Sequence, residues 1–96
     1  MTVGYEDDVE DYLVERVEEL GGICPKLVDI GRKGFPDRTV MLPGRQIYFI
    51  ETKCKDGKVK PWQKRYHEEL RSFGLTTLVI RTKHQVDYFL ATYVLA

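Results

Sequence analysis

The sequence predicts an α/β fold in which a mixed β-sheet is flanked by helices. Three observations predict it: a segment of helical periodicity opens the chain, a strand–turn–strand pattern occupies its middle, and a helix–strand–helix pattern closes it. The expected order of elements is α, β, β, β, α, β, α. A strand that follows a helix after a hairpin is accommodated most easily in a mixed sheet with helices on its faces.

The first helix is expected over residues 6–20. Its apolar residues recur at helical spacing, at Val9, Leu13, Val17 and Leu20. The glycine pair that follows supplies the helix stop. Glu6 and Glu10 precede the apolar residues on the same stripe, so they are expected beside the buried face. The next segment, "ICPKLVDI" at residues 23–30, is predicted to be a short strand, and "GRKGFP" at residues 31–36 a loop.

Residues 37–55 are expected to form a hairpin that turns at Pro43 and Gly44. Alternate side chains of a strand share a face, so one face of the second strand begins apolar and then leaves the core to enter a cleft. The residues of that face are Ile47, Phe49, Glu51 and Lys53. If the chain reverses about Gly44, Asp37 falls opposite Glu51 to within one residue of register. The hairpin therefore predicts two adjacent carboxylates.

Two helices and a strand are expected after the hairpin. Pro61 suits the first turn of a helix that ends at Gly74. Its apolar stripe is predicted from Trp62, Tyr66, Leu70 and Phe73. Residues 75–81, "LTTLVIR", are predicted to be an apolar strand. The final helix, over residues 82–96, is expected to turn Val86, Phe89, Leu90 and Tyr93 toward the core.

The 96 residues are enough for one domain, spanning 1–96, and too few for a second recognition domain. Hydrophobic residues at 43% and charged residues at 31% are typical of a globular protein and exclude a disordered one. No apolar run approaches the roughly 18 residues of a membrane span, and the acidic N-terminus does not resemble a secretory signal. A cytoplasmic protein is therefore expected.

Cysteine spacing and charge distribution narrow the function classes. Cys24 and Cys54 lie far apart without a CxxC or Cys/His cluster, so both are expected to be free, mostly buried thiols.

Net charge is zero, but residues 1–19 hold eight acids and one base, whereas residues 20–96 hold fourteen bases and seven acids. Such asymmetry is a reason to consider a polyanionic partner.

The paired carboxylates point to a metal ion. Each acid alone has an ordinary interpretation: Asp37 caps a turn after Pro36, and Glu51 forms a surface pair with Lys53. Opposed carboxylates repel each other, so together they are expected to share a proton or bind a cation. Hard oxygen ligands select Mg²⁺ or Mn²⁺. Lys53 is then placed to hold an attacking water or to meet charge that develops on phosphorus. Without metal, Asp37→Ala is expected to relieve repulsion and to melt no lower than wild type.

These residues carry a resemblance. "PD" at Pro36 and Asp37 followed by "ETK" at Glu51–Lys53 resembles the signature of the PD-(D/E)xK nuclease superfamily. The acidic first helix ending in "GG", "GFPDR", "YFIETK" and "PWQKRYHEELRSFG" are similar to its VRR-NUC branch, the virus-type replication-repair nuclease domain often encoded alone in phages. The resemblance covers nearly the whole chain and implies a restriction-endonuclease-like αβββαβ core with a C-terminal helix.

The resemblance also implies roles for individual residues. Asp37 and Glu51 correspond to metal ligands, with the Thr52 backbone carbonyl as a further ligand. Lys53 corresponds to the catalytic lysine, and Gln63 to a helix glutamine near the metal or the scissile phosphate. A glutamate of the first helix belongs to the pattern; Glu10 is favoured over Glu6 as catalytic residue and metal ligand, and the choice stays open.

The position of Gln63 has its own physical logic. It lies in the first turn after Pro61, where free backbone N–H groups and the helix dipole favour a phosphate. The alternative is an ordinary polar residue on an exposed first turn. His67, one turn later, could assist, although an exposed helix histidine is the expectation.

Basic residues surround the predicted site and favour DNA contact over a merely solvated loop. Their phosphate contacts would give affinity without base specificity. On one flank they are Lys55, Lys58, Lys60, Lys64 and Arg65, and on the other Arg32, Lys33 and Arg38. No base-reading module is evident, which indicates recognition of DNA shape.

The resemblance further implies a homodimer acting on branched DNA such as four-way (Holliday) junctions. The apolar run at residues 88–96 could help build the dimer interface, but a last core helix is the expectation. The leading hypothesis is therefore a Mg²⁺- or Mn²⁺-dependent, structure-selective endonuclease without an organic cofactor. It would act in phage replication, recombination or repair, in the cytoplasm of the host cell if the chain is phage-encoded. A noncatalytic DNA- or protein-binding module on the same scaffold is the alternative, and a sequence-preferring, restriction-like nuclease is a third.

Overall fold

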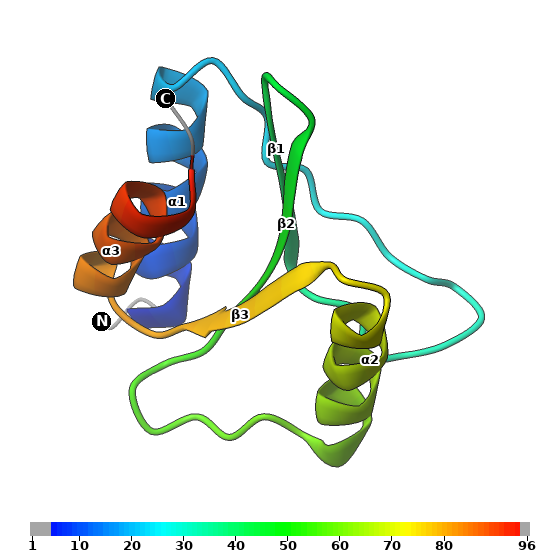
Figure 1. Ribbon diagram of the computed structural model, residues 1–96. Coiled ribbons are helices and arrows are strands. Elements are labelled where there is room, and N and C mark those ends of the chain that lie inside the picture. Colours follow the sequence, from blue (N-terminus) through cyan, green and yellow to red (C-terminus); the bar gives the residue numbers. More distant parts are fainter. Residues whose placement is uncertain (1–4, 95–96) are drawn as a thin grey trace.

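The computed structural model describes residues 5–94, with side chains from residue 8 onward. Its elements are α1 (Tyr5–Glu19), β1 (Arg38–Leu42), β2 (Gln46–Thr52), α2 (Pro61–Ser72), β3 (Thr76–Ile80) and α3 (Lys83–Tyr93). Strand β2 lies centrally, antiparallel to β1 and parallel to β3. Helices α1 and α3 cover one face of this mixed sheet and α2 lies on the other (Figure 1). The predicted α/β class is confirmed.

The strand predicted over residues 23–30 does not form. Ile23 makes an isolated antiparallel bridge with Met41, and the carbonyl of Pro25 accepts one further hydrogen bond from Thr39 N–H at 3.0 Å. Pro25 has no N–H to continue a ladder, so the chain leaves the sheet there. The segment beyond it is exposed, with Val28 at 83% and Ile30 at 98% of full exposure. The observed order is therefore αββαβα.

Glycines end α1 and α2 as predicted. After α1, the N–H of Gly22 donates to Val17 and that of Gly21 to Glu18, and Gly21 has a φ of 84°. This is the Schellman arrangement, in which a residue with positive φ satisfies the last carbonyls. Gly74 ends α2 in the same way, also with a φ of 84°. Leu20 lies beyond the end of α1 and is exposed, so the predicted apolar stripe is one residue too long.

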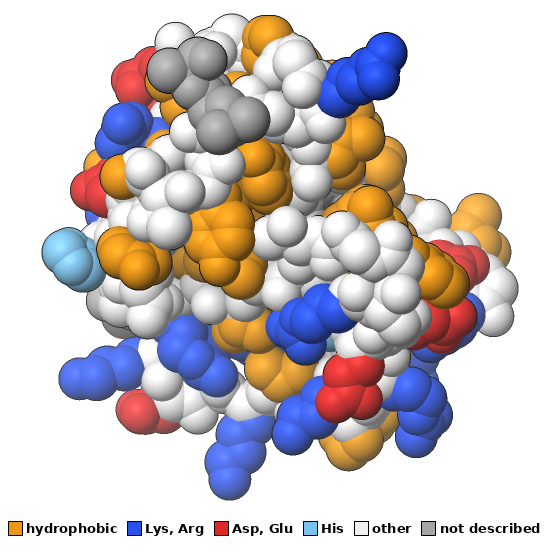
Figure 2. Space-filling view, in the orientation of Figure 1, with side chains coloured by type: hydrophobic (Ala, Val, Ile, Leu, Met, Phe, Trp, Pro, Cys, Tyr) orange, Lys and Arg blue, Asp and Glu red, His pale blue; other side chains and the backbone are white. Residues whose placement is uncertain are grey.

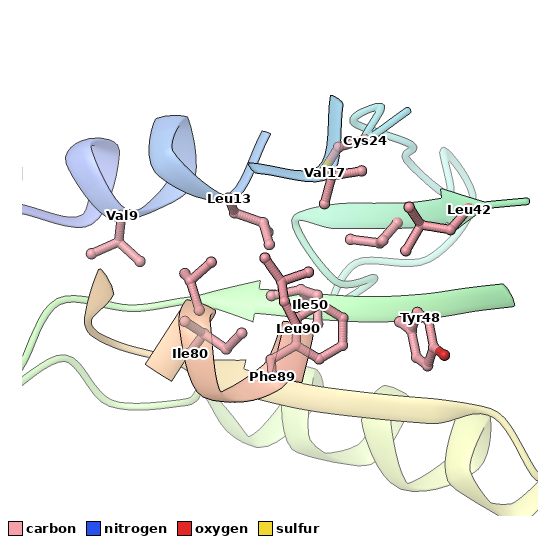
Figure 3. Close-up of a cluster of buried hydrophobic side chains, with 12 residues drawn as sticks. Val9, Leu13, Val17, Cys24, Leu42, Tyr48, Ile50, Ile80, Phe89 and Leu90 are labelled. Atoms are coloured by element: carbon pink, nitrogen blue, oxygen red, sulfur yellow. The ribbon is translucent and has the colours of Figure 1, made fainter. Parts of the chain in front are cut away.

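The hydrophobic core lies between the sheet and the α1/α3 layer. Figure 3 shows the α1 side chains Val9, Leu13 and Val17 pointing toward the strands and toward α3. The strands contribute Val40, Leu42, Tyr48, Ile50 and Ile80, and α3 contributes Val86, Phe89 and Leu90. Helix α3 is thus a core helix, as expected. None of the helices in residues 5–94 is both long and apolar enough to cross a membrane.

The core occupies the opposite face of β2 from the predicted one. Tyr48 and Ile50 are buried in it, whereas Ile47 is 46% exposed. Phe49 and Glu51 instead face α2. Phe35 bridges the two elements, with its ring 5.7 Å from that of Phe49 and 5.4 Å from that of Tyr66 in edge-on geometry. The pleat was predicted correctly, but the large apolar cluster belongs to the even-numbered residues.

Helix α2 buries only part of the predicted stripe. His67 and Leu70 are buried, whereas Trp62 and Phe73 are 38% and 66% exposed. His67, expected to be exposed, is only 1% exposed. The face of β2 under α2 carries the carboxylate of Glu51, so polar partners from α2 are placed there in preference to large apolar side chains.

Candidate active site

The hairpin register brings Asp37 to Glu51. Arg38 pairs with Ile50 and Thr39 with Phe49, so Asp37, just before β1, lies across from Glu51. Its Oδ2 accepts hydrogen bonds from the Thr52 backbone N–H at 2.9 Å and from Thr52 Oγ1 at 3.0 Å. Asp37 is therefore held against the end of β2 by its own contacts, and the predicted register is confirmed.

Glu51 is a buried carboxylate, with 1% of its surface exposed. Its Oε2 accepts a hydrogen bond from Gln63 Nε2 at 2.9 Å and lies 3.6 Å from Lys53 Nζ. Its Oε1 lies 3.5 Å from His67 Nε2, and neither of these two buried atoms has a hydrogen-bond partner. The expectation that this face leaves the core and opens into a cleft at Glu51 is wrong, because α2 covers the carboxylate.

Burial raises the pKa of the Glu51 carboxyl above its ordinary value. The neighbouring His67 opposes this shift, the negative charge of Asp37 adds to it, and Lys53 opposes it. The site therefore holds a carboxylate whose charge is incompletely compensated by protein groups. Such a group gains stability from an added cation.

Gln63 connects the start of α2 to Glu51. Its Oε1 accepts a hydrogen bond from the Lys60 backbone N–H at 2.8 Å, while its Nε2 donates to Glu51. Pro61 occupies the first turn, where its missing N–H costs nothing. The amide therefore ties the carboxylate to the N-terminal end of a helix, where N–H groups favour anions.

Lys53 and Thr52 flank Glu51 along β2. The Lys53 side chain is 14% exposed and has its ammonium near Glu51, as the alternation of the strand predicts. Thr52 is fully buried, and its hydroxyl and N–H hold Asp37. Its backbone carbonyl remains a predicted ligand.

The first-helix glutamate has contacts of its own. Glu10 is 7% exposed; its Oε2 accepts from Arg38 Nε at 2.7 Å and lies 3.5 Å from Lys26 Nζ. Arg38 also donates to the Cys24 carbonyl at 2.8 Å, which gives it a role inside the protein that the sequence did not predict. Glu10 thus contacts two cations on the α1 side of the sheet. The side chain of Glu6, the other candidate, lies outside the described residues.

The residues present fit a hard divalent cation in donor chemistry and in charge. Within residues 8–94, no cluster of three or more His, Cys, Asp or Glu side chains is preassembled around one point. The structure instead brings together two carboxylates, Asp37 and Glu51. The Oε1 atom of Glu51 is buried and has no hydrogen-bond partner. Oxygen donors of this type suit Mg²⁺ or Mn²⁺, with water as further ligands.

Basic side chains follow Lys53 along the chain. Lys55, Lys58, Lys60, Lys64 and Arg65 are all exposed. In Figure 2, Lys and Arg side chains gather over the lower part of the face, where Figure 1 places the β2–α2 loop and the start of α2, with acidic side chains among them. Arg81 holds this loop, donating to the carbonyls of Cys54 at 2.9 Å and Gly57 at 2.5 Å. Lys55, Lys58 and Lys60 therefore project from a braced loop, and Lys64 and Arg65 from the start of α2.

The loop before Asp37 is fastened to α2. The Tyr66 hydroxyl donates to Asp29 at 2.7 Å. Arg32 pairs with Glu69 at 2.7 Å, and its guanidinium lies over the Tyr66 ring, 3.8 Å from the ring centre. The Lys33 ammonium lies 4.0 Å from the centre of the Trp62 ring. Gly34 has a φ of 107°, and a Cβ there would approach the Trp62 carbonyl oxygen to 2.5 Å. The segments that carry Asp37 and Gln63 are thereby held together.

The sequence does not predict the observed contacts of three contributing residues. It predicts an exposed His67 that could at most assist at the site. Its spacing of four from Gln63, which puts both on one helix face, was the available signal. For the internal roles of Arg38 and Arg81 the sequence offers no local signal, since their partners are distant in the chain.

Known proteins resemble this chain over most of its length. No family model matches it. A protein named "Putative nuclease p44", from Acyrthosiphon pisum secondary endosymbiont phage 1, is 43% identical over 75 residues, which are 78% of this chain and 81% of that protein. A solved structure described as a VRR_NUC domain has a TM-score of 0.90 and 39% identity, over 95% of this chain and 99% of that one. The chain belongs to the VRR-NUC family of the PD-(D/E)xK nuclease superfamily.

Proposed function

We propose that this protein is a Mg²⁺- or Mn²⁺-dependent endodeoxyribonuclease that cuts phosphodiester bonds in branched DNA. The observation that carries the proposal is the buried Glu51 carboxylate, placed across from Asp37 and contacted by Gln63 and Lys53. A buried charge beside a second charge of the same sign is unfavourable unless a cation or a proton compensates it. The name of the phage relative, a nuclease, agrees with this reading.

Asp37 and Glu51 would hold the metal ion, joined by the Thr52 backbone carbonyl and by Glu10 or Glu6 of the first helix. When bound, such an ion lowers the pKa of a water molecule and polarises a phosphoryl oxygen. Glu10 is engaged by Arg38 and Lys26. Its participation therefore requires that it exchange some of that pairing for the metal.

The protein's own groups perform the positioning. Lys53 offers an ammonium beside Glu51, where it can orient the attacking water or neutralise charge on a nonbridging phosphate oxygen. Gln63 fixes the orientation of Glu51 and lies in the first turn of α2, whose free N–H groups attract a phosphate. The Lys53 side chain, 14% exposed, and the buried Glu51 keep the reacting centre partly shielded from bulk water.

The exposed cations would supply DNA affinity. Lysines of the β2–α2 loop, together with Lys64 and Arg65 of α2, can contact phosphates on one side of the site. Arg32 and Lys33 approach α2 from the other side, each stacked on an aromatic ring. Contacts of this kind read backbone geometry and not base identity, which supports selectivity for DNA structure. A homodimer would present two such sites to a four-way junction.

Cleavage of a labelled DNA panel tests the function. The panel comprises linear duplex, single strand, flap, splayed arm and four-way junction, each with Mn²⁺ or with EDTA. We expect metal-dependent cutting that favours branched DNA and disappears in Lys53→Ala, while Lys64→Ala, on the exposed surface, cuts at a reduced rate. Binding without cutting by the wild-type protein on every DNA would indicate the noncatalytic module instead.

A further inference from the structure

We infer that His67 is a positioning residue that donates a hydrogen bond from Nε2 to Oε1 of Glu51 and so holds this carboxylate ready for the metal ion. The inference rests on the proposed function and extends it to a residue that does not belong to the metal-ligand set. Gln63 holds one oxygen of Glu51, and His67 is assigned to the other.

The first observation is a pair of buried atoms that face each other. Glu51 Oε1 and His67 Nε2 are 3.5 Å apart, both are inaccessible to solvent, and neither has another hydrogen-bond partner. A buried polar atom left unsatisfied is destabilising, because it has given up its hydrogen bonds to water. Two such atoms side by side satisfy each other if one of them carries a proton, and a small rotation of either side chain brings them into hydrogen-bond range.

The second observation is the geometry of α2. Gln63 and His67 are four residues apart, one helical turn, so their side chains leave the same face of α2 toward β2. Gln63 Nε2 reaches Oε2 and His67 Nε2 reaches the neighbourhood of Oε1. One turn of helix therefore addresses both oxygens of a single carboxylate.

Chemistry selects the direction of the bond. A carboxylate only accepts hydrogen bonds, whereas an imidazole Nε2 donates when it bears the proton and accepts when it does not. Two acceptors buried at 3.5 Å would repel each other, so the Glu51 charge favours the form of His67 with a proton on Nε2. An apolar side chain would fill the same volume without this effect, which separates a positioning role from simple packing.

Calorimetric titration of the metal-free protein with Mn²⁺ tests the inference. His67→Met removes the donor and keeps similar volume and helix propensity, whereas His67→Gln retains an N–H donor near the same place. Loss of an outer partner of a metal ligand typically weakens metal binding about 10–100-fold. We expect that loss in His67→Met, which should also melt below wild type in EDTA because the buried Glu51 Oε1 loses its donor, and substantial recovery of both properties in His67→Gln.

The outcomes separate this inference from the proposed function. If wild type binds Mn²⁺ and cuts DNA while His67→Met binds Mn²⁺ equally well, the positioning role is refuted and the function stands. If wild type neither binds Mn²⁺ nor cuts, both are overturned. A second test uses the wild-type protein alone and therefore does not depend on whether a variant folds. The ¹⁵N–¹H spectrum of the metal-free form should show a proton on His67 Nε2, and an Nε2 without a proton would overturn the inference.

Discussion

Replacing Glu51 by glutamine should raise the thermal stability of the metal-free protein at neutral pH. The substitution keeps the shape of the side chain and removes a charge that is 1% exposed and lies beside Asp37. Gln63 can still donate to the new amide oxygen. Relief of an incompletely satisfied buried charge is worth about 1–3 kcal/mol, and each kcal/mol raises Tm by about 4–8 °C in a domain of this size.

The pH dependence of the gain has a definite sign. The folded-state pKa of Glu51 is raised, so the folded protein binds the proton more tightly than the unfolded chain does. The penalty on wild type is therefore absent below the unfolded carboxyl pKa of about 4.3 and complete above the raised folded value. The advantage of Glu51→Gln should be largest at about pH 8 and should shrink as the pH falls through that window.

Melting curves followed by circular dichroism, with EDTA and with Mn²⁺, measure the effect. In Mn²⁺ the order should reverse, because the wild type gains metal-binding free energy and Glu51→Gln loses a ligand. Glu68→Gln is the matched control, since Glu68 is an exposed glutamate of α2, the helix that covers Glu51. A Glu51→Gln protein that melts below wild type in EDTA at about pH 8 would refute the account of a destabilising buried charge.

Three further results are expected. Asp37→Ala should melt below wild type in EDTA, with a free energy of unfolding lower by about 1–3 kcal/mol, because Thr52 loses an acceptor for both its N–H and its hydroxyl. This prediction replaces the expectation that the substitution only relieves charge repulsion, and an unchanged Tm would contradict it. Arg38→Met removes the cation closest to the buried Glu10 and should lower the free energy of unfolding, measured in urea, by about 3 kcal/mol. A decrease in stability no larger than that of a surface substitution would argue against this ion pair. Burial raises the pKa of the Cys24 thiol to about 11, so at about pH 8 it should resist a thiol reagent until the protein unfolds, and rapid labelling of the native protein would show otherwise.

Local patterns determined most of the fold. The turn at Pro43 and Gly44 and the two-residue period of the flanking strands predict the register of β1 and β2, because a slip of one residue would move every side chain to the other face. That register alone brings Asp37 to Glu51. The same period places Lys53 with Glu51, so the carboxylate–lysine part of the site was predictable without tertiary information.

Segment 23–30 marks where local patterns fail. Its apolar residues have the composition of a strand, but strand formation requires a continuous ladder of backbone partners. Only Ile23 and Pro25 find partners on β1, and Pro25 cannot donate. The exposure of Val28 and Ile30 follows from that loss of partners and not from their hydrophobicity.

The family pattern, the hairpin register and the carboxylate–lysine cluster follow from the amino-acid sequence alone, since each depends on short spacings along one strand or one turn. The packing of helices on the sheet is what covers Glu51 with α2, brings Gln63 and His67 to its two oxygens and pairs Glu10 with Arg38. These outcomes depend on which face of a helix meets which face of the sheet. A buried charge requires polar partners wherever the fold can bring them, and this requirement overrides the apolar periodicity of the helix that supplies them.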